Sequence, residues 1–408
     1  MNLTYIKNEV QPVRVNVGGQ LDPAEVIGRD KLAKTVWRTL EKQSVILSAE
    51  RRIGKTNLIR KMQAEASTDK LAIYRDLEGT KTPLEFAENI YQDVEQYLST
   101  QKKAGARMQS LLKHLGGIQI GNFLKLPENV SQHHWKDLLT ATIADLTEHE
   151  ERTIVLFWDE MPYMIYDIAR TVNENAAMEV LDTLRQLRNQ HKNLRMVFTG
   201  SIGLHSVITS FKKVGYANDP TNDMKLIDVP NLEPEYAEEV ARELLRGESV
   251  VSDDLLSTAK AIASICDGNA FYIQFVVDRI AQTGEPASPA SVELLIESCL
   301  TDPQDGWHMQ HYRERINTYY TDAQDQQFAL SILDIVAISP TPVLFNALFN
   351  QLKANMATDD QEKARNMLTL LQRDHYIVLE TNGAYRYRFP LIQRSWRLQR
   401  GLTLQELI

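Results

Sequence analysis

The stretch SVILSAERRIGKT, residues 44–56, decides the fold of this 408-residue chain. It opens on a short β-rich run, SVILS, and is followed by residues with the apolar spacing of a helix that extends to Ala66. Between the two lies a loop that ends in Gly54, Lys55 and Thr56. A loop at a helix N-terminus directs backbone N–H groups into a common hollow, where an anion such as a phosphate binds. The sequence therefore predicts a phosphate site between this strand and this helix.

The motif is a P-loop with one departure, because Ala49 stands where the motif has its first glycine. A backbone position that needs a positive φ would resist an alanine. In a P-loop the lysine bridges the terminal phosphates and the next hydroxyl holds Mg²⁺, so we expect Lys55 to act in catalysis and Thr56 to bind the metal. The residues expected to contact the nucleotide are Glu50, Arg51, Arg52, Ile53, Gly54, Lys55, Thr56 and Asn57.

A second motif, TIVLFWDE, occupies residues 153–160. Its apolar run, Ile154 to Trp158, is typical of a strand that is buried on both faces. Asp159 would hold Mg²⁺ or its water at the end of this strand, and Glu160 would polarise the attacking water. The alternative is an acidic pair that caps the following turn. The P-loop upstream favours the first interpretation, a Walker B motif.

A third strand-like run ends in Phe198-Thr199-Gly200-Ser201. A hydroxyl at this place can sense the γ-phosphate of a nucleotide, and Ser201 or Thr199 could supply it. A strand-to-turn junction uses the same small polar residues for backbone reasons alone. The sequence leaves both interpretations open.

The order of elements predicts the fold class. Strands expected at 44–48, 71–76, 153–158 and 194–199 alternate with helices expected at 55–66, 82–98, 135–147 and 174–190, a pattern that predicts a parallel α/β sheet. The stretch 116–127 interrupts this order and predicts a β-hairpin.

Beyond the sheet, helical patterns dominate from Pro234 to Leu300. Near the C-terminus, Asn382-Gly383 separates two strand-like runs within 376–389, a strong hairpin signal after three helical segments, and the combination predicts a winged helix. The expected domains are an N-terminal arm, 1–25; a P-loop domain, 26–230; a helical lid, 231–300; a connector, 301–324; and a winged-helix domain, 325–408.

Composition narrows the class of protein. The chain has 45 basic and 54 acidic residues, a net charge of −9, so as a whole it is no polyanion binder. Its two cysteines, Cys266 and Cys299, form neither a disulfide framework nor a C-x-x-C metal site. No apolar run is long enough to span a bilayer, and the first ten residues do not resemble a signal peptide. We therefore expect a soluble, cytoplasmic protein that does not contact membranes.

Two other groups of residues suggest sites that we do not favour. Asp305, His308 and His311 have the spacing of one helical face, but three ligands on an exposed helix make an open metal site, and a packing surface is preferred. An arginine-rich stretch near the C-terminus suggests DNA, yet the segment from Thr301 onward carries eleven basic and twelve acidic residues. This charge balance favours a protein contact. The arginines are Arg386, Arg388, Arg394, Arg397 and Arg400.

These motifs together resemble a known family, the archaeal-type, STAND-like P-loop ATPases of the AAA+ superfamily, in the branch related to origin recognition. The resemblance rests on the ERRIGKT loop, FWDEMPYM, FTGSIG, IDVPNL and CDGNAFY, and it runs from about Val26 to the C-terminus. It implies that ATP and Mg²⁺ bind between the P-loop domain and the lid and act as a switch. One departure is Gly268-Asn269-Ala270-Phe271, where relatives carry a lid arginine and a switch-type proline.

The function that follows is a regulatory ATPase that couples nucleotide state to partner binding or assembly, in a prokaryotic antiviral defence or stress module. One alternative is a DNA-binding, initiator-like loader, and another is a nucleotide-stabilised scaffold with little hydrolysis. The expected partners are ATP, a protein effector and further copies of the chain, with DNA not favoured. Arg185 and Arg188 could face a neighbouring subunit's nucleotide, although a solvated helical face is the simpler interpretation.

Overall fold

The computed structural model describes residues 12–98, 118–120, 123–125, 132–200, 203–213, 215–216, 218–320 and 322–404. It divides into two compact units. The sheet unit consists of Asp30–Arg51 and Lys55–Val229, and the helical unit consists of Met1–Arg29, Arg52–Gly54 and Pro230–Ile408. The chain therefore passes from one unit to the other four times, twice within the predicted P-loop.

The sheet unit is built on five parallel strands in the order β2-β5-β6-β1-β7. Four of them confirm the predicted strands, and the fifth, β7, was not predicted. The strands are β1 (Val45–Ser48), β2 (Lys70–Asp76), β5 (Thr153–Asp159), β6 (Leu194–Phe198) and β7 (Lys225–Asp228).

Strand β5 is buried on both faces, as its continuous apolar run predicted. All six residues from Ile154 to Asp159 are buried. Leu156 and Trp158 belong to the hydrophobic cluster on one face, whereas Phe157 points to the other face and packs edge-on against Trp37, with ring centroids 5.9 Å apart. Alternate side chains thus meet two different helix layers, as in a parallel sheet covered on both sides.

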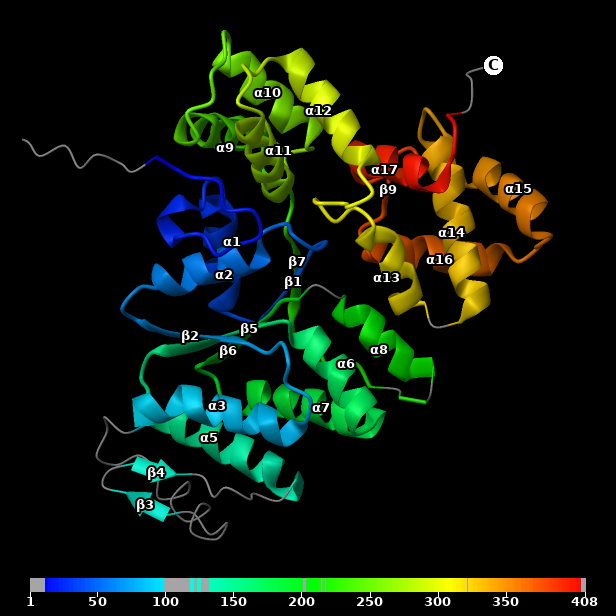
Figure 1. Cartoon of the computed structure of the whole chain (residues 1–408). Helices are drawn as coiled ribbons and strands as arrows, with labels where there is room; N and C mark the ends of the chain where they lie inside the picture. Colours follow the sequence, from blue (N-terminus) through cyan, green and yellow to red (C-terminus); the bar gives the residue numbers. More distant parts are fainter. Residues whose placement is uncertain are drawn as a thin grey trace, which may run out of the picture. The chain divides into compact units, whose positions relative to one another are not determined.

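Helices cover both faces of this sheet (Figure 1). Helices α1 and α2 lie on one side, and α3, α5 and α7 lie on the other. The helices of the sheet unit are α1 (Asp30–Leu40), α2 (Lys55–Ala64), α3 (Pro83–Leu98), α5 (Trp135–His149), α6 (Met161–Thr171), α7 (Glu174–Gln190) and α8 (Leu204–Lys213). The predicted hairpin is also confirmed, because β3 (Ile118–Ile120) pairs antiparallel with β4 (Phe123–Lys125).

The helical unit contains the remaining helices and a small sheet. Its elements are α9 (Pro234–Gly247), α10 (Leu255–Ile265), α11 (Ala270–Thr283), α12 (Pro289–Thr301), α13 (His311–Tyr319), α14 (Ala323–Ile338), β8 (Val343–Leu344), α15 (Phe345–Met356), α16 (Gln361–Arg373), β9 (Ile377–Leu379), β10 (Ala384–Tyr387) and α17 (Pro390–Arg400). One hydrophobic cluster runs through it from Leu232 to Trp396, so the predicted lid and the C-terminal residues share a core.

Helix α13 shows how this core is continuous. The Arg315 guanidinium donates to Asp374 O at 3.0 Å and lies 5.3 Å from the centre of the Tyr376 ring. Tyr376 in turn donates to Tyr312 O at 2.7 Å. On the other side, the centre of the Trp307 ring lies 6.0 Å from the centre of the Tyr272 ring in α11. The segment predicted as a connector, 301–324, is therefore packed against both of its neighbours in the helical unit.

The second predicted hairpin is confirmed. Strand β10 pairs antiparallel with β9 and with β8, in the order β8-β10-β9. At the turn, Gly383 has a φ of 84° and donates its N–H to Glu380 O at 2.9 Å, while the Asn382 side chain accepts from Ala384 N. Asn-Gly forms this turn readily because glycine tolerates a positive φ.

The N-terminal residues from Pro12 onward pack on the helical unit. Val15 N donates to the Glu248 side chain and Asn16 N to the Gln274 side chain, both at 2.9 Å. A Cβ at Gly247 would stand 1.9 Å from Val13 O, so only glycine allows this approach. The described part of the predicted arm is thus held by specific contacts.

Candidate functional site

The loop after β1 is closed by the side chain of its own lysine. Lys55 is the first residue of α2, and its side chain is buried. Its ammonium donates to Ala49 O at 2.9 Å and to Glu50 O at 2.7 Å. The positive charge therefore lies inside the loop at a helix N-terminus, where an anion would meet both the ammonium and the backbone N–H groups of the first helical turn.

Ala49 causes no backbone strain. The positive φ values of this loop belong to Arg52, at 65°, and Gly54, at 95°. The expectation that an alanine at position 49 would resist the loop geometry is therefore wrong, since that position is not left-handed. The strained residue is Arg52, because a non-glycine residue in this region costs of order 1 kcal/mol.

The structure brings the two predicted metal ligands together. Asp159, at the end of β5, is 3% exposed. Its Oδ2 accepts the Thr56 hydroxyl at 2.5 Å, and its Oδ1 accepts Glu160 N at 3.1 Å. Burial raises the pKa of Asp159, and the nearby Asp76 carboxylate raises it too, while the Thr56 and Glu160 hydrogen bonds and Lys55 act in the opposite direction. A cation placed here would remove the cost of that buried charge.

Glu160 follows directly and has an unusual backbone. Its φ and ψ are 53° and 27°, a left-handed conformation at the N-cap of α6. Its side chain makes no capping hydrogen bond to that helix, so the capping alternative does not account for it. Strain of this kind in a non-glycine residue is common at functional sites.

The absence of a side chain at Gly200 leaves space for Pro162 and for the side chain of Glu160. A Cβ at Gly200 would stand 2.6 Å from Pro162 Cδ and 3.4 Å from Glu160 Oε2. The side chain of Glu160 therefore passes beside the backbone at the end of β6. This close approach explains the glycine in the Phe198-Thr199-Gly200-Ser201 stretch better than a turn requirement does.

Thr199 carries a hydroxyl with no hydrogen-bond partner among the described residues. It is 1% exposed, and its backbone is fully engaged, donating to Trp158 O at 3.1 Å and accepting from Met161 N at 3.0 Å. Ser201, the other residue expected to sense the γ-phosphate, lies outside the described residues. Thr199 is thus the described candidate for that role.

Asp76 ends β2 beside Asp159, since the two residues are partners in the β2–β5 register. Its Oδ1 accepts Glu78 N at 2.9 Å, a local turn contact that precedes α3 by several residues. The Asp76 carboxylate thus stabilises this turn and raises the pKa of Asp159.

Three consecutive loop residues, Arg52–Gly54, belong to the helical unit. The Arg52 guanidinium lies over the Phe271 ring of α11, 4.3 Å from its centre. Ile53 is buried, and its carbonyl accepts a hydrogen bond from Arg29 at 2.9 Å. Sequence reasoning named Arg52 and Ile53 as nucleotide contacts but gave Arg29 no role. Of the other expected contacts, Glu50 is buried, Arg51 exposed and Asn57 half-buried.

Arg188 does not lie on a solvated face. It is buried and donates to both oxygens of Asp223 at 2.8 Å and to Pro220 O at 2.8 Å. Arg185 donates to Asp219 O at 3.3 Å. The simple interpretation of an exposed helical face is therefore wrong for Arg188, which forms a buried ion pair with Asp223.

The histidine candidates do not form a metal site. Helix α13 begins only at His311, so Asp305 and His308 precede it. The Asp305 carboxylate accepts from Met309 N and Gln310 N, both at 2.7 Å. Within the described ranges no group of three or more His, Cys, Asp or Glu side chains could hold a metal ion.

In the described part of the chain, none of the helices combines the length and apolar character that a bilayer crossing requires.

Known proteins resemble this chain in one domain and in the fold as a whole. Residues 38–208 match the family described as "AAA domain". The Walker-type ATPase PABY2304 of Pyrococcus abyssi has a similar structure, with 15% identity and a TM-score of 0.64 over 94% of this chain and 99% of that one. The ORC2 protein of Aeropyrum pernix, solved as ADPNP–ADP complexes, is similar with 11% identity and a TM-score of 0.51 over 97% and 98% of the two chains. No curated protein matches the chain in sequence.

Residues 38–208 are therefore similar to an AAA domain, and they lie in a unit built on a parallel α/β sheet. The predicted fold class is confirmed, and the likeness in fold to the archaeal structures covers nearly the full length. The predicted resemblance to AAA+ P-loop ATPases is supported by the match to the AAA domain, and the resemblance to the ORC2 structure is one of fold.

Proposed function

We propose that the chain binds ATP with Mg²⁺ at the P-loop, hydrolyses it slowly and uses nucleotide state as a switch for partner binding. One observation carries this proposal: the Thr56 hydroxyl meets the Asp159 carboxylate at 2.5 Å, from segments far apart in the sequence, beside the buried ammonium of Lys55. A hydroxyl, a carboxylate and a lysine at a helix N-terminus are the groups that a metal-bound triphosphate needs.

The residues present fit a magnesium ion. Thr56 and Asp159 offer hard oxygen ligands, and magnesium completes its shell with water and phosphate oxygens. Bound there, Mg²⁺ would neutralise charge on the transferring phosphate. The chain's own part is to hold the phosphates with Lys55 and the loop N–H groups, which requires the ammonium to leave the carbonyls of Ala49 and Glu50.

Hydrolysis is assigned to groups at the ends of β5 and β6. The Glu160 carboxylate would orient and polarise a water, and the Thr199 hydroxyl would donate to the γ-phosphate or to that water. The buried hydroxyl of Thr199, which has no partner within the described ranges, supports this role, because such a group costs free energy until a ligand satisfies it.

We propose a protein partner for the C-terminal residues, which we interpret as a winged helix, because three of the five arginines that suggested DNA are paired with carboxylates. Arg386 pairs with Glu380 at 2.8 Å, Arg394 with Glu293 at 2.6 Å, and Arg400 with Asp334 at 2.5 Å. Charges already paired release few counterions on meeting a phosphate backbone. The similar ORC2 structure of Aeropyrum pernix was solved as ADPNP–ADP complexes, which agrees with ATP as the ligand.

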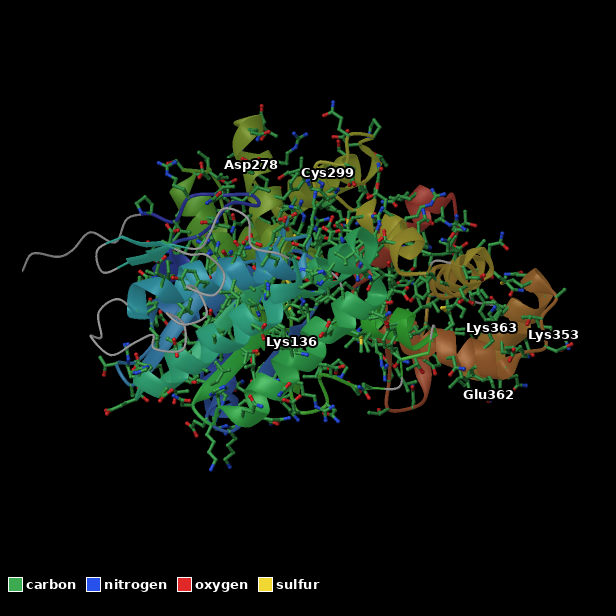
Figure 2. The ribbon with its side chains drawn as sticks, turned by 90° about the horizontal axis from the view of Figure 1, so that it is seen from below. Lys136, Asp278, Cys299, Lys353, Glu362 and Lys363 are labelled. Carbon is green, nitrogen blue, oxygen red and sulfur yellow. The ribbon has the colours of Figure 1, made fainter. Side chains whose placement is uncertain are left out.

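The same charge pairing extends to α15 and α16. Lys363, labelled in Figure 2, lies 3.2 Å from Asp325. Glu362, its neighbour in the same view, pairs with Arg365 at 2.6 Å. Lys353 also forms an ion pair, with Asp359. The side chains of α15 and α16 thus carry charges of both signs, which suits a protein effector or a second copy of the chain.

The setting of this switch is the cytoplasm, in a defence or stress module, as the family resemblance and the cysteine usage suggest. The test of the proposal is isothermal titration of the full chain with a slowly hydrolysed ATP analogue, with and without Mg²⁺. Saturable binding that tightens with Mg²⁺ supports it. Absence of binding in both conditions contradicts it.

A further inference from the structure

Arg29 is a buried cation bound only to main-chain carbonyls. It is the last residue before α1 and is 4% exposed. One guanidinium nitrogen donates to Ile53 O at 2.9 Å, and the other donates to Pro230 O at 2.7 Å. A single planar group thus joins the P-loop backbone to the residue that follows β7 and precedes α9.

The charge of this guanidinium has no carboxylate partner in the part of the chain that the structure describes. Burial alone lowers the pKa of Arg29 to about 10, so the group remains protonated at neutral pH. Burying a charge that only carbonyl dipoles stabilise costs free energy. We therefore look for a role that this geometry serves. Its position next to Ile53, two residues before Lys55, also adds positive potential where phosphates would bind.

Arg29 lies where the chain passes between the two units. The unit boundaries fall at Arg29–Asp30, on both sides of Arg52–Gly54, and at Val229–Pro230. The side chain of Arg29 therefore contacts residues at or next to each of these crossings. Gly28 supports this placement, because a Cβ there would stand 2.7 Å from Tyr236 Cβ and its φ is +75°.

The residues after Pro230 continue the connection within the helical unit. The Asn231 side chain donates to Asp267 O at 2.7 Å, and Leu232 N donates to Gly268 O at 3.0 Å. Asp267 Oδ2 accepts Leu391 N at 2.9 Å, at the start of α17. A displacement of the Ile53 carbonyl would thus reach the C-terminal residues through Arg29 and two hydrogen-bonded turns.

We propose that Arg29 is a positioning residue that fixes the P-loop backbone at Ile53 and transmits its displacement on nucleotide binding to the Pro230–Leu232 segment. This inference rests on the proposed function, since it assigns the route by which ATP at the P-loop alters the helical unit. Arg29 touches no reacting atom. It acts by setting where the N–H groups of Gly54 and Lys55 point and by tying them to a second segment.

The test compares Arg29→Met and Arg29→Lys in the full chain with the matched control Arg195→Met. Arg195 also donates to main-chain carbonyls, among them Leu40 O at 2.6 Å and Glu41 O at 3.0 Å, at the opposite end of the sheet. ATP affinity and amide hydrogen exchange at Leu232 and in α2 are measured with and without Mg²⁺ and a slowly hydrolysed ATP analogue. Circular dichroism checks folding.

In Arg29→Met we expect ATP affinity to fall about tenfold, since a hydrogen bond to a charged group is lost. At saturating nucleotide, the amides of α2 become protected from hydrogen exchange as in the wild type. The exchange rate of the Leu232 amide, however, no longer changes when nucleotide binds. Arg29→Lys keeps part of the affinity because the charge remains, yet it also loses the response at Leu232, because one ammonium cannot take the place of the two-armed fork. Arg195→Met keeps both responses.

If nucleotide still changes the hydrogen exchange of the Leu232 amide in both Arg29 variants, the proposal is overturned and Arg29 is a structural residue only. If Arg29→Met does not fold, Arg29→Lys decides by the same readout. A wild-type chain that fails to bind the ATP analogue contradicts the proposed function instead, and that outcome is visible before any variant is compared.

Discussion

Lys55 shows how a single residue prepares the loop for a ligand. Its ammonium donates to Ala49 O and Glu50 O, and a bound phosphate would replace these carbonyls as its acceptor. Lys55→Ala removes this charge from a site that needs it, so we expect ATP affinity to fall roughly 10- to 100-fold, the range for a charge-assisted contact. Titration calorimetry measures the loss.

The matched control is Lys34→Ala, which removes an exposed lysine from α1. It is expected to bind ATP as the wild type does. Equal affinity in Lys55→Ala and the wild type, with both folded by circular dichroism, would remove the P-loop lysine from the binding site.

Glu160 is the second residue whose role can be isolated. Glu160→Gln keeps the size of the side chain and leaves Thr56 and Asp159 in place, so nucleotide and Mg²⁺ should still bind. The loss of a carboxylate that polarises water is expected to slow hydrolysis about 100-fold or more. Single-turnover hydrolysis of radiolabelled ATP measures this rate.

Glu151→Gln, just before β5 at the other end of the strand, serves as the control and should hydrolyse ATP at the wild-type rate. If Glu160→Gln turns over ATP as fast as this control, the left-handed Glu160 is a structural feature and another group positions the water.

At the scale of elements, the success of sequence reasoning follows from burial. Strands β1, β2, β5 and β6 were predictable because each is a short β-rich apolar run. Strand β7 was not, because Leu226 is 63% exposed and none of its four residues is buried. The other edge strand, β2, was predictable because buried and partly buried residues alternate along it.

The candidate site divides in the same way. Thr56 and Asp159 were predictable as a pair because P-loop chemistry requires a hydroxyl and a carboxylate at strand ends. Arg29 was not, because its role depends on carbonyls of Ile53 and Pro230, and main-chain acceptors leave no trace in a sequence. The strain at Arg52 and Glu160 was equally invisible, since backbone angles are fixed by packing.

The Asp267 carboxylate accepts a hydrogen bond from Leu391 N at the start of helix α17. Burial raises the pKa of Asp267 from 3.8 to about 6, against the opposing effects of the Leu391 N–H and Arg386. The folded chain therefore binds a proton more tightly than the unfolded chain does. The contribution of Asp267 to the free energy of unfolding is greatest below pH 4 and falls as pH rises to about 6, by about 3 kcal/mol.

Asp267→Asn removes this titration while its amide oxygen can still accept Leu391 N. Relative to the wild type, the variant should gain stability between pH 4 and pH 7 in chemical denaturation. Asp254→Asn, which changes an exposed N-cap carboxylate at α10, is the control and should show no comparable gain. A parallel pH dependence of Asp267→Asn and the wild type would mean that the carboxyl is solvated in solution.

At the scale of the whole molecule, the question is what the C-terminal residues recognise. They share one hydrophobic cluster with the predicted lid, from Leu232 to Trp396, so the experiment must use the full chain. We predict that it binds generic duplex DNA no more tightly than about 10⁻⁴ to 10⁻⁶ M at physiological salt, the range of non-specific binding. A net charge of −9 and the pairing of Arg386 and Arg394 with glutamates are the reasons.

The variant that tests this prediction replaces Arg386, Arg388 and Arg394 with glutamine. Because two of these arginines neutralise glutamates, their loss frees acidic charge on the surface and should alter nucleotide-dependent assembly or effector binding, while weak DNA binding stays unchanged. A mobility-shift assay across a salt series and light scattering with ATP and Mg²⁺ measure the two effects. Submicromolar affinity for one duplex, with a steep salt dependence that the triple substitution abolishes, would require uncompensated arginines and would identify the chain as an initiator-like DNA binder.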